Sequence, residues 1–253
     1  MNTTTLILIY LGVALVGSMI PFIRVFFAHF HNLIHLVVSV CLEGGKIRLY
    51  PDGSGQTTGD TPAFKKALIS YAGYTVASVA AIGLFYLATK GHYLWVIYLY
   101  LGLSVLALVL WIRNAFGVLW SLSVIALLAV PVYFHYQTSL PVNFNFDTVL
   151  VHISIFLASV LFVQSVICAV QVCRQGFMSR KNPKRKAALV QTKFIPAALL
   201  GLILFGQTVF AGYFFALNFI SLPFSLDIDL STHLLDAKDV IWSTVSGVLS
   251  SKG

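Results

Sequence analysis

The chain has 253 residues, of which 58% are hydrophobic and only 9% are charged. A soluble globular domain needs roughly a quarter of its residues charged, so this composition excludes a soluble protein and predicts one that is solvated by lipid. The formal net charge of +8 does not indicate nucleic-acid binding, because the basic residues lie in short connections between apolar segments, as membrane orientation requires.

Seven apolar segments are long enough to cross roughly 30 Å of hydrocarbon. In chain order they span residues 4–20, 25–42, 68–88, 93–112, 116–134, 149–172 and 194–220. The first segment lacks the basic start and the small-residue cleavage site of a removable signal peptide, so we expect it to remain as a span. The sequence therefore predicts an all-α polytopic membrane protein with about seven transmembrane helices.

A polar, glycine-rich connection, residues 43–66, joins the second span to the third. The alternation of residues 46–50 has a period of two and favours a small hairpin at the membrane surface. We interpret Glu43 as the end of the second span. The expected structural turn residues are Gly44, Gly45, Asp52, Gly53 and Gly55.

Basic residues crowd the connection between the sixth and seventh spans, and an excess of Lys and Arg marks cytoplasmic loops. They are Arg174, Arg180, Lys181, Lys184, Arg185, Lys186 and Lys193. Counting six crossings back from this loop predicts a multi-pass protein of the cell membrane with a cytoplasmic N-terminus. Residues 221–253 become an extracytoplasmic tail, in which the apolar spacing of 237–249 fits either an interfacial helix or a frayed end.

Three histidines lie in the second span, where ionisable residues are costly and mark a candidate functional site. His31 and His35 are four residues apart, so they share one face of a helix within reach of a single metal ion. His29 lies about 200° around the helix from His31 and is expected outside that site. Zinc peptidases with this spacing carry a glutamate as general base directly after the first histidine, whereas this chain has Asn32.

The surroundings of these histidines resemble the N-terminal signature of bacterial site-2-protease-like membrane metallopeptidases. The segments that carry the resemblance are Pro21-Phe22-Ile23-Arg24, His31-Asn32-Leu33-Ile34-His35, Glu43-Gly44-Gly45-Lys46, Pro51-Asp52-Gly53-Ser54-Gly55, Arg113-Asn114-Ala115-Phe116-Gly117 and Thr192 to Pro196. The resemblance covers residues 20–220 and is tightest at its start. It implies an intramembrane zinc metallopeptidase in which His31 and His35 bind the metal.

The sequence also departs from the family pattern. Asn32 occupies the general-base position, and an amide accepts no proton at neutral pH. Ile34 adds bulk where the family has a glycine, and residues 182–186, aligned with the family's aspartate ligand, contain no carboxylate. Glu43 is the only glutamate in the chain, and Asp147 is the only acidic residue between residues 60 and 227. The acidic residues therefore complete neither a zinc site nor a replacement base.

The leading hypothesis is a catalytically inactive relative, a pseudoprotease, that scaffolds or regulates a membrane-protein partner. One alternative is an active zinc metallopeptidase with a non-standard base and third ligand; another is a small transporter or ion-relay protein.

We expect no bound cofactor, and His31 and His35 are then hydrogen-bonded packing residues at a helix interface. The alternative is zinc on these two histidines. Its third ligand would come from His29, His92, His152 or Cys41. Cys41, Cys168 and Cys173 are otherwise expected to pack as small apolar residues.

Overall fold

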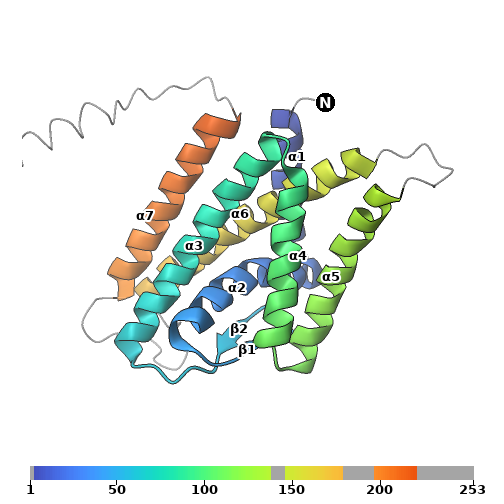
Figure 1. Cartoon of the computed structure of the whole chain (residues 1–253). Helices are drawn as coiled ribbons and strands as arrows, with labels where there is room; N and C mark the ends of the chain where they lie inside the picture. The colour runs from blue at the N-terminus through green and yellow to red at the C-terminus, as the bar shows by residue number, and fades with distance from the viewer. Residues whose placement is uncertain (1–2, 138–145, 179–196, 221–253) are drawn as a thin grey trace, which may run out of the picture. The chain divides into compact units, whose positions relative to one another are not determined.

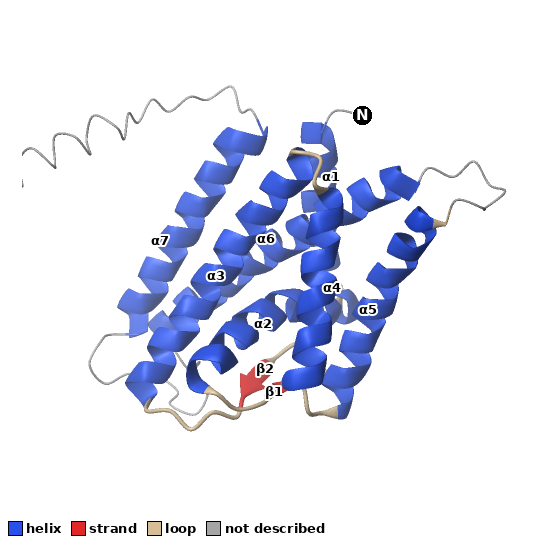
Figure 2. Cartoon of the chain, in the orientation of Figure 1, coloured by secondary structure: helices blue, strands red, loops and turns tan. Residues whose placement is uncertain are grey.

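The computed structural model describes residues 3–137, 146–178 and 197–220. Within these ranges the helices are α1 (Thr3–Gly17), α2 (Pro21–Glu43), α3 (Ala63–Thr89), α4 (Tyr93–Leu110), α5 (Ala115–Tyr136), α6 (Phe146–Met178) and α7 (Ala197–Phe215), which the π-helical turn η3 (Ala216–Ile220) continues. Six of them, α2 to α7, are long and apolar enough to span a membrane, and α1 is a shorter apolar helix. The prediction of an all-α polytopic membrane protein is confirmed (Figures 1 and 2).

Helices dominate because lipid offers no hydrogen bonds to the backbone, so each spanning segment must satisfy its own N–H and C=O groups. The outer faces of these helices carry large apolar side chains, among them Val16, Val109 and Leu119, the last 66% exposed. Such surfaces are stable in lipid and would associate in water. The basic residues 180–193, the segment Thr192 to Pro196 and the C-terminal tail lie outside the described residues.

A two-stranded hairpin, β1 (Ile47–Leu49) and β2 (Gly55–Thr57), lies in the connection where alternation predicted a small strand pair. The strands are antiparallel, with Arg48 opposite Gln56. Ile47 and Leu49 are fully buried and Arg48 is exposed, as a period of two requires. The residues between the strands, 50–54, are called the tip below.

An aromatic cluster joins α2 to α4 and α5. Phe30 is 1% exposed, and its ring centroid lies 5.4 Å from that of Tyr100 and 5.5 Å from that of Trp120. Phe26 packs edge-on against Phe30 at 5.4 Å. Edge-to-face contacts of this kind stabilise beyond simple burial, so Phe30 fixes the position of α2 in the bundle.

The first helix runs parallel to α6. In the middle of α1, the Tyr10 hydroxyl lies 2.8 Å from Nδ1 of His152. Just beyond the end of α1, the hydroxyl of Ser18 accepts a hydrogen bond from Nε2 of Gln164 at 2.9 Å. Later residues of α1 therefore lie beside later residues of α6.

The second helix advances along α6 in the same direction. The Phe27 ring packs against Phe156 with centroids 5.6 Å apart, and further along His31 lies beside Cys168. α2 therefore does not turn back along α1, and it lies across the half of the bundle that holds the hairpin (Figure 1). Two antiparallel spans would run in opposite senses along α6.

The helices α6 and α7 are antiparallel. A Cβ placed on Gly201, early in α7, would lie 3.0 Å from Cα of Cys173, whereas the ring of Phe215, at the end of α7, packs against Phe162 with centroids 4.8 Å apart. The start of α1, the start of α6 and the end of α7 consequently share one end of the bundle. The hairpin lies at the other end, called the hairpin end below (Figure 1).

Candidate functional site

The two histidines of the predicted site share one face of α2, as their spacing requires. Their rings are nearly parallel, with an interplanar angle of 13° and centroids 6.3 Å apart. His31 is 1% exposed, and His35 is half-buried. Tyr74 of α3 packs against both, with centroids 5.6 Å from His31 and 4.3 Å from His35.

The polar contacts of this pair come from two other helices. Nε2 of His35 lies 3.3 Å from the Ser70 hydroxyl of α3. Nδ1 of His31 lies 3.7 Å from Sγ of Cys168 on α6, within hydrogen-bond distance for sulfur. Nε2 of His31 is buried without a hydrogen-bond partner among the described residues. The pair thus meets a thiol, a hydroxyl and a phenol ring.

Cys168 is the site residue that sequence reasoning missed, since it was expected only as a packing side chain. It lies 137 residues from His31 in the chain, and no spacing pattern connects positions that far apart. The third-ligand candidates chosen from the sequence lie elsewhere. Cys41 is exposed, His152 contacts Tyr10, His29 faces the hairpin, and His92 precedes α4 at the far end from the hairpin.

Asn32, at the general-base position, faces the hairpin. Its Nδ2 donates to the carbonyl of Gly53 at 2.9 Å. Nε2 of the buried His29 donates to the carbonyl of Tyr50 at 3.1 Å. These two residues therefore bind the tip of the hairpin, on a different side of α2 from His31.

The predicted turn residues lie at both ends of the hairpin. Gly44, Gly45 and Gly53 have φ values of 78°, 101° and 83°, which favour glycine. Oδ1 of Asp52 accepts hydrogen bonds from the Ser54 hydroxyl and amide, at 2.6 and 2.9 Å. These bonds stabilise the carboxylate and lower the pKa of Asp52.

Gly55 has a different constraint from these turn glycines. A Cβ at this position would lie 2.5 Å from Cδ1 of Leu36 on α2. The small residue therefore allows β2 to lie directly on the helix, and a larger side chain at this position would require the Leu36 side chain to shift.

The donor set around the histidines does not fit a zinc site. A structural or catalytic zinc needs at least three protein donors within about 2.3 Å of one point. No group of three His, Cys, Asp or Glu side chains in the described part of the chain meets that requirement. Glu43, the only glutamate in the chain, is the last residue of α2. Its carboxylate accepts a hydrogen bond from the hydroxyl of Thr57 in the hairpin.

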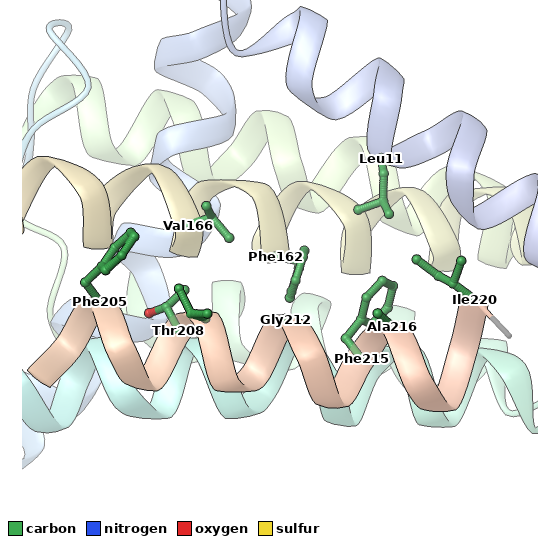
Figure 3. Close-up of a pocket in the computed structure, with 10 residues that line it drawn as sticks. Leu11, Phe162, Val166, Phe205, Thr208, Gly212, Phe215, Ala216 and Ile220 are labelled. Atoms are coloured by element: carbon green, nitrogen blue, oxygen red, sulfur yellow. The ribbon is translucent and has the colours of Figure 1, made fainter. Parts of the chain in front are cut away.

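A separate apolar cavity of about 310 Å³ lies between α1, α6 and α7 (Figure 3). Leu11, Phe162 and Gly212 contribute to its wall. Its one polar side chain, Thr208, donates its hydroxyl to the carbonyl of Leu204. The residues that line this cavity include none of the predicted site residues.

Comparison with protein families gives a match over residues 3–220 to the family described as Peptidase M50B-like. Peptidases of the M50 group usually depend on zinc. Searches of curated proteins and of solved structures found no match. The family match includes all the described helices and both histidines. The chain belongs to the M50B-like peptidase family.

Proposed function

We propose that this chain is a catalytically inactive M50B-like membrane protein with a scaffold or regulatory role. The observation that carries the proposal is the environment of His31 and His35. Their contacts are Cys168, Ser70 and Tyr74, and the amide at position 32 is bonded to the hairpin. A metallopeptidase needs a third metal ligand and a general base for the attacking water, and this environment contains neither in carboxylate form.

The active-peptidase alternative has one observation in its favour. The thiol of Cys168 lies next to His31, and zinc binds thiolates and imidazoles readily. His35, however, contacts Ser70, so a zinc ion shared with Cys168 would require His35 to reorient. We therefore retain this alternative as the hypothesis that the metal measurement must exclude.

The zinc content of the purified full-length protein tests the proposal. After mild chelation and zinc back-titration, we expect the wild type to retain no more zinc than a His31→Ala/His35→Ala variant, because the histidines lack a third ligand. Elemental analysis gives the stoichiometry. Near-stoichiometric zinc that is lost in the double variant would contradict the proposal. Loss of the same zinc in Cys168→Ser would then identify the third ligand.

The partner that we propose for such a scaffold is another membrane protein. The lipid-facing surfaces of α4 and α5 expose Trp95, Val109 and Leu119. Helix association inside a membrane depends on van der Waals packing rather than on the hydrophobic effect. A partner helix would therefore replace lipid on such a face without requiring polar contacts.

We propose a membrane orientation in which α1 begins outside the cell. Most described basic residues lie at the hairpin end: Arg24, Lys46, Arg48, Lys65, Lys66 and Arg113. Arg24 belongs to this group because the next residue, Val25, lies against Gly53 of the tip. The positive-inside rule makes the hairpin end cytoplasmic. Since the start of α1 and the end of α7 lie at the opposite end of the bundle from the hairpin, both are then extracytoplasmic.

Cysteine labelling of intact cells tests this orientation, in a background with the three native cysteines replaced by serine. We expect an impermeant maleimide to label Thr3→Cys and Lys90→Cys fully, and Arg48→Cys only after permeabilisation. All three parent residues are exposed. Labelling of Thr3→Cys only after permeabilisation would instead support the cytoplasmic N-terminus that seven alternating spans predict.

A further inference from the structure

The hairpin lies along a single stripe of α2 that is distinct from the histidine face. The contacting positions are Val25, Ala28, His29, Asn32, Leu36 and Glu43. They recur at spacings of three, four and seven residues, which follow one side of a helix. His31 contacts α6 and His35 contacts α3 instead. The helix thus uses one side for the histidine pair and another for the hairpin.

The strands of the hairpin have a second anchor, the turn between α4 and α5. The amide of Ile47 donates to the carbonyl of Trp111 at 2.9 Å, and the amide of Arg113 donates to the carbonyl of Ile47 at 3.3 Å. The side chain of Asn114 donates to the Leu49 carbonyl and accepts from its amide. This anchor reaches β1 but not the tip. In the described part of the chain, the side-chain hydrogen bonds that reach the tip from another element come from His29 and Asn32.

The chemistry of the tip requires donors at these two positions. Both partners are backbone carbonyls, which only accept hydrogen bonds. Because Nε2 of His29 donates to Tyr50, its neutral ring presents Nδ1 as an acceptor, and this atom lies 3.5 Å from Nδ2 of Asn32. The side chain at position 32 therefore faces two acceptors, which the two N–H groups of an amide match.

We infer that His29 and Asn32 form a latch that holds the hairpin tip closed on α2, and that the latch requires an amide at position 32. A carboxylate there would face two acceptors with no proton to donate, so it would repel the tip. Asn32, which departs from the peptidase motif, consequently positions the hairpin tip on α2. The latch holds whether or not the chain cleaves peptides, so its test is independent of activity and metal content.

Hydrogen–deuterium exchange on the full-length protein in lipid nanodiscs tests the latch through the peptide that covers residues 47–58. Exchange of its amides depends on local opening, and opening breaks the latch. We expect Asn32→Asp, which keeps the side-chain shape, to accelerate this exchange about tenfold. Asn32→Ala should have a smaller effect, because it removes the donor without adding a repelling oxygen. His29→Phe should also accelerate exchange, since it retains a ring but loses the bond to Tyr50.

The matched control is Asn218→Asp, which makes the same chemical change where the amide donates within its own helix, to the carbonyl of Phe214. It should leave exchange in residues 47–58 unchanged. Wild-type exchange in Asn32→Asp would overturn the inference. Acceleration spread equally over α4 would also overturn it, because general destabilisation would then explain the effect. Equal acceleration by alanine and aspartate would still support the latch, because both variants lack the amide donor, and loss of that donor would then account for the whole effect.

Discussion

Replacing Phe30 by alanine is expected to lower the free energy of unfolding by about 3 kcal/mol. The ring is almost fully buried and contacts Phe26, Tyr100 and Trp120. Its removal leaves a cavity at the junction of three helices, and the rigid rings around it cannot collapse to fill the space. Unfolding measured in mixed detergent micelles gives the change.

The size of this loss of stability depends on the medium that solvates the Phe30 side chain in the unfolded state. In a water-soluble protein, Phe→Ala in the core costs about 3–5 kcal/mol, part of which is transfer from water. A membrane protein that unfolds in detergent keeps its apolar groups in an apolar medium, so the packing term dominates and the lower end applies.

The matched control for this substitution is Phe22→Ala, also on α2, where the side chain is 90% exposed. It should change stability by less than about 0.5 kcal/mol. A comparable loss at both positions would show that α2 is not held by the aromatic cluster.

The helices were predictable because lipid restricts a spanning chain to few backbone structures. Apolar segments of sufficient length therefore predict helices directly, and the alternation around Lys46 to Tyr50 anticipated the strand pair. The spacing of His31 and His35 placed both rings on one face of α2, where they lie. Each of these inferences uses residues that are near one another in the chain.

The contacts between distant segments were not predictable. Cys168 reaches His31 because α6 crosses α2 at that level, and no local pattern specifies such a crossing. Asn32 was recognised as a missing base, yet its bond to Gly53 depends on where the hairpin folds back. Sequence reasoning thus identified which chemical group was lost and could not say what the replacement binds.

The direction of α1 was inaccessible for a different reason. Hydropathy detects an apolar segment but not the direction in which it crosses the membrane. The default assumption is that successive spans cross in opposite directions. The short turn after α1, in which the amide of Ile20 donates to the carbonyl of Gly17, carries no sequence signal that distinguishes a reversal from a bend. Contacts with α6 supply that information.

The second large effect is expected at Gly73, where α3 crosses α2 beside His35. A Cβ at this position would lie 2.7 Å from Cδ2 and 2.8 Å from the backbone oxygen of His35. The backbone oxygen belongs to a helix and cannot move without shifting α2. Overpacking of this kind costs about 1–3 kcal/mol, and replacing glycine by alanine in a helix returns up to about 1 kcal/mol. Gly73→Ala should therefore lower the free energy of unfolding by about 1–2 kcal/mol.

Gly83 provides a comparison within the same helix, because a Cβ there has no neighbouring atom within 4 Å. Gly83→Ala should leave stability unchanged or raise it by up to about 1 kcal/mol through helix propensity alone. The two variants make the same chemical change in α3. If Gly73→Ala lowers the free energy of unfolding and Gly83→Ala does not, the difference is due to the contact with His35. Equal effects would mean that α2 and α3 do not approach this closely and that the histidine pair lies in a looser site. The predicted order therefore tests, without any measurement of activity, the helix crossing on which the arrangement of His31, His35 and Tyr74 depends.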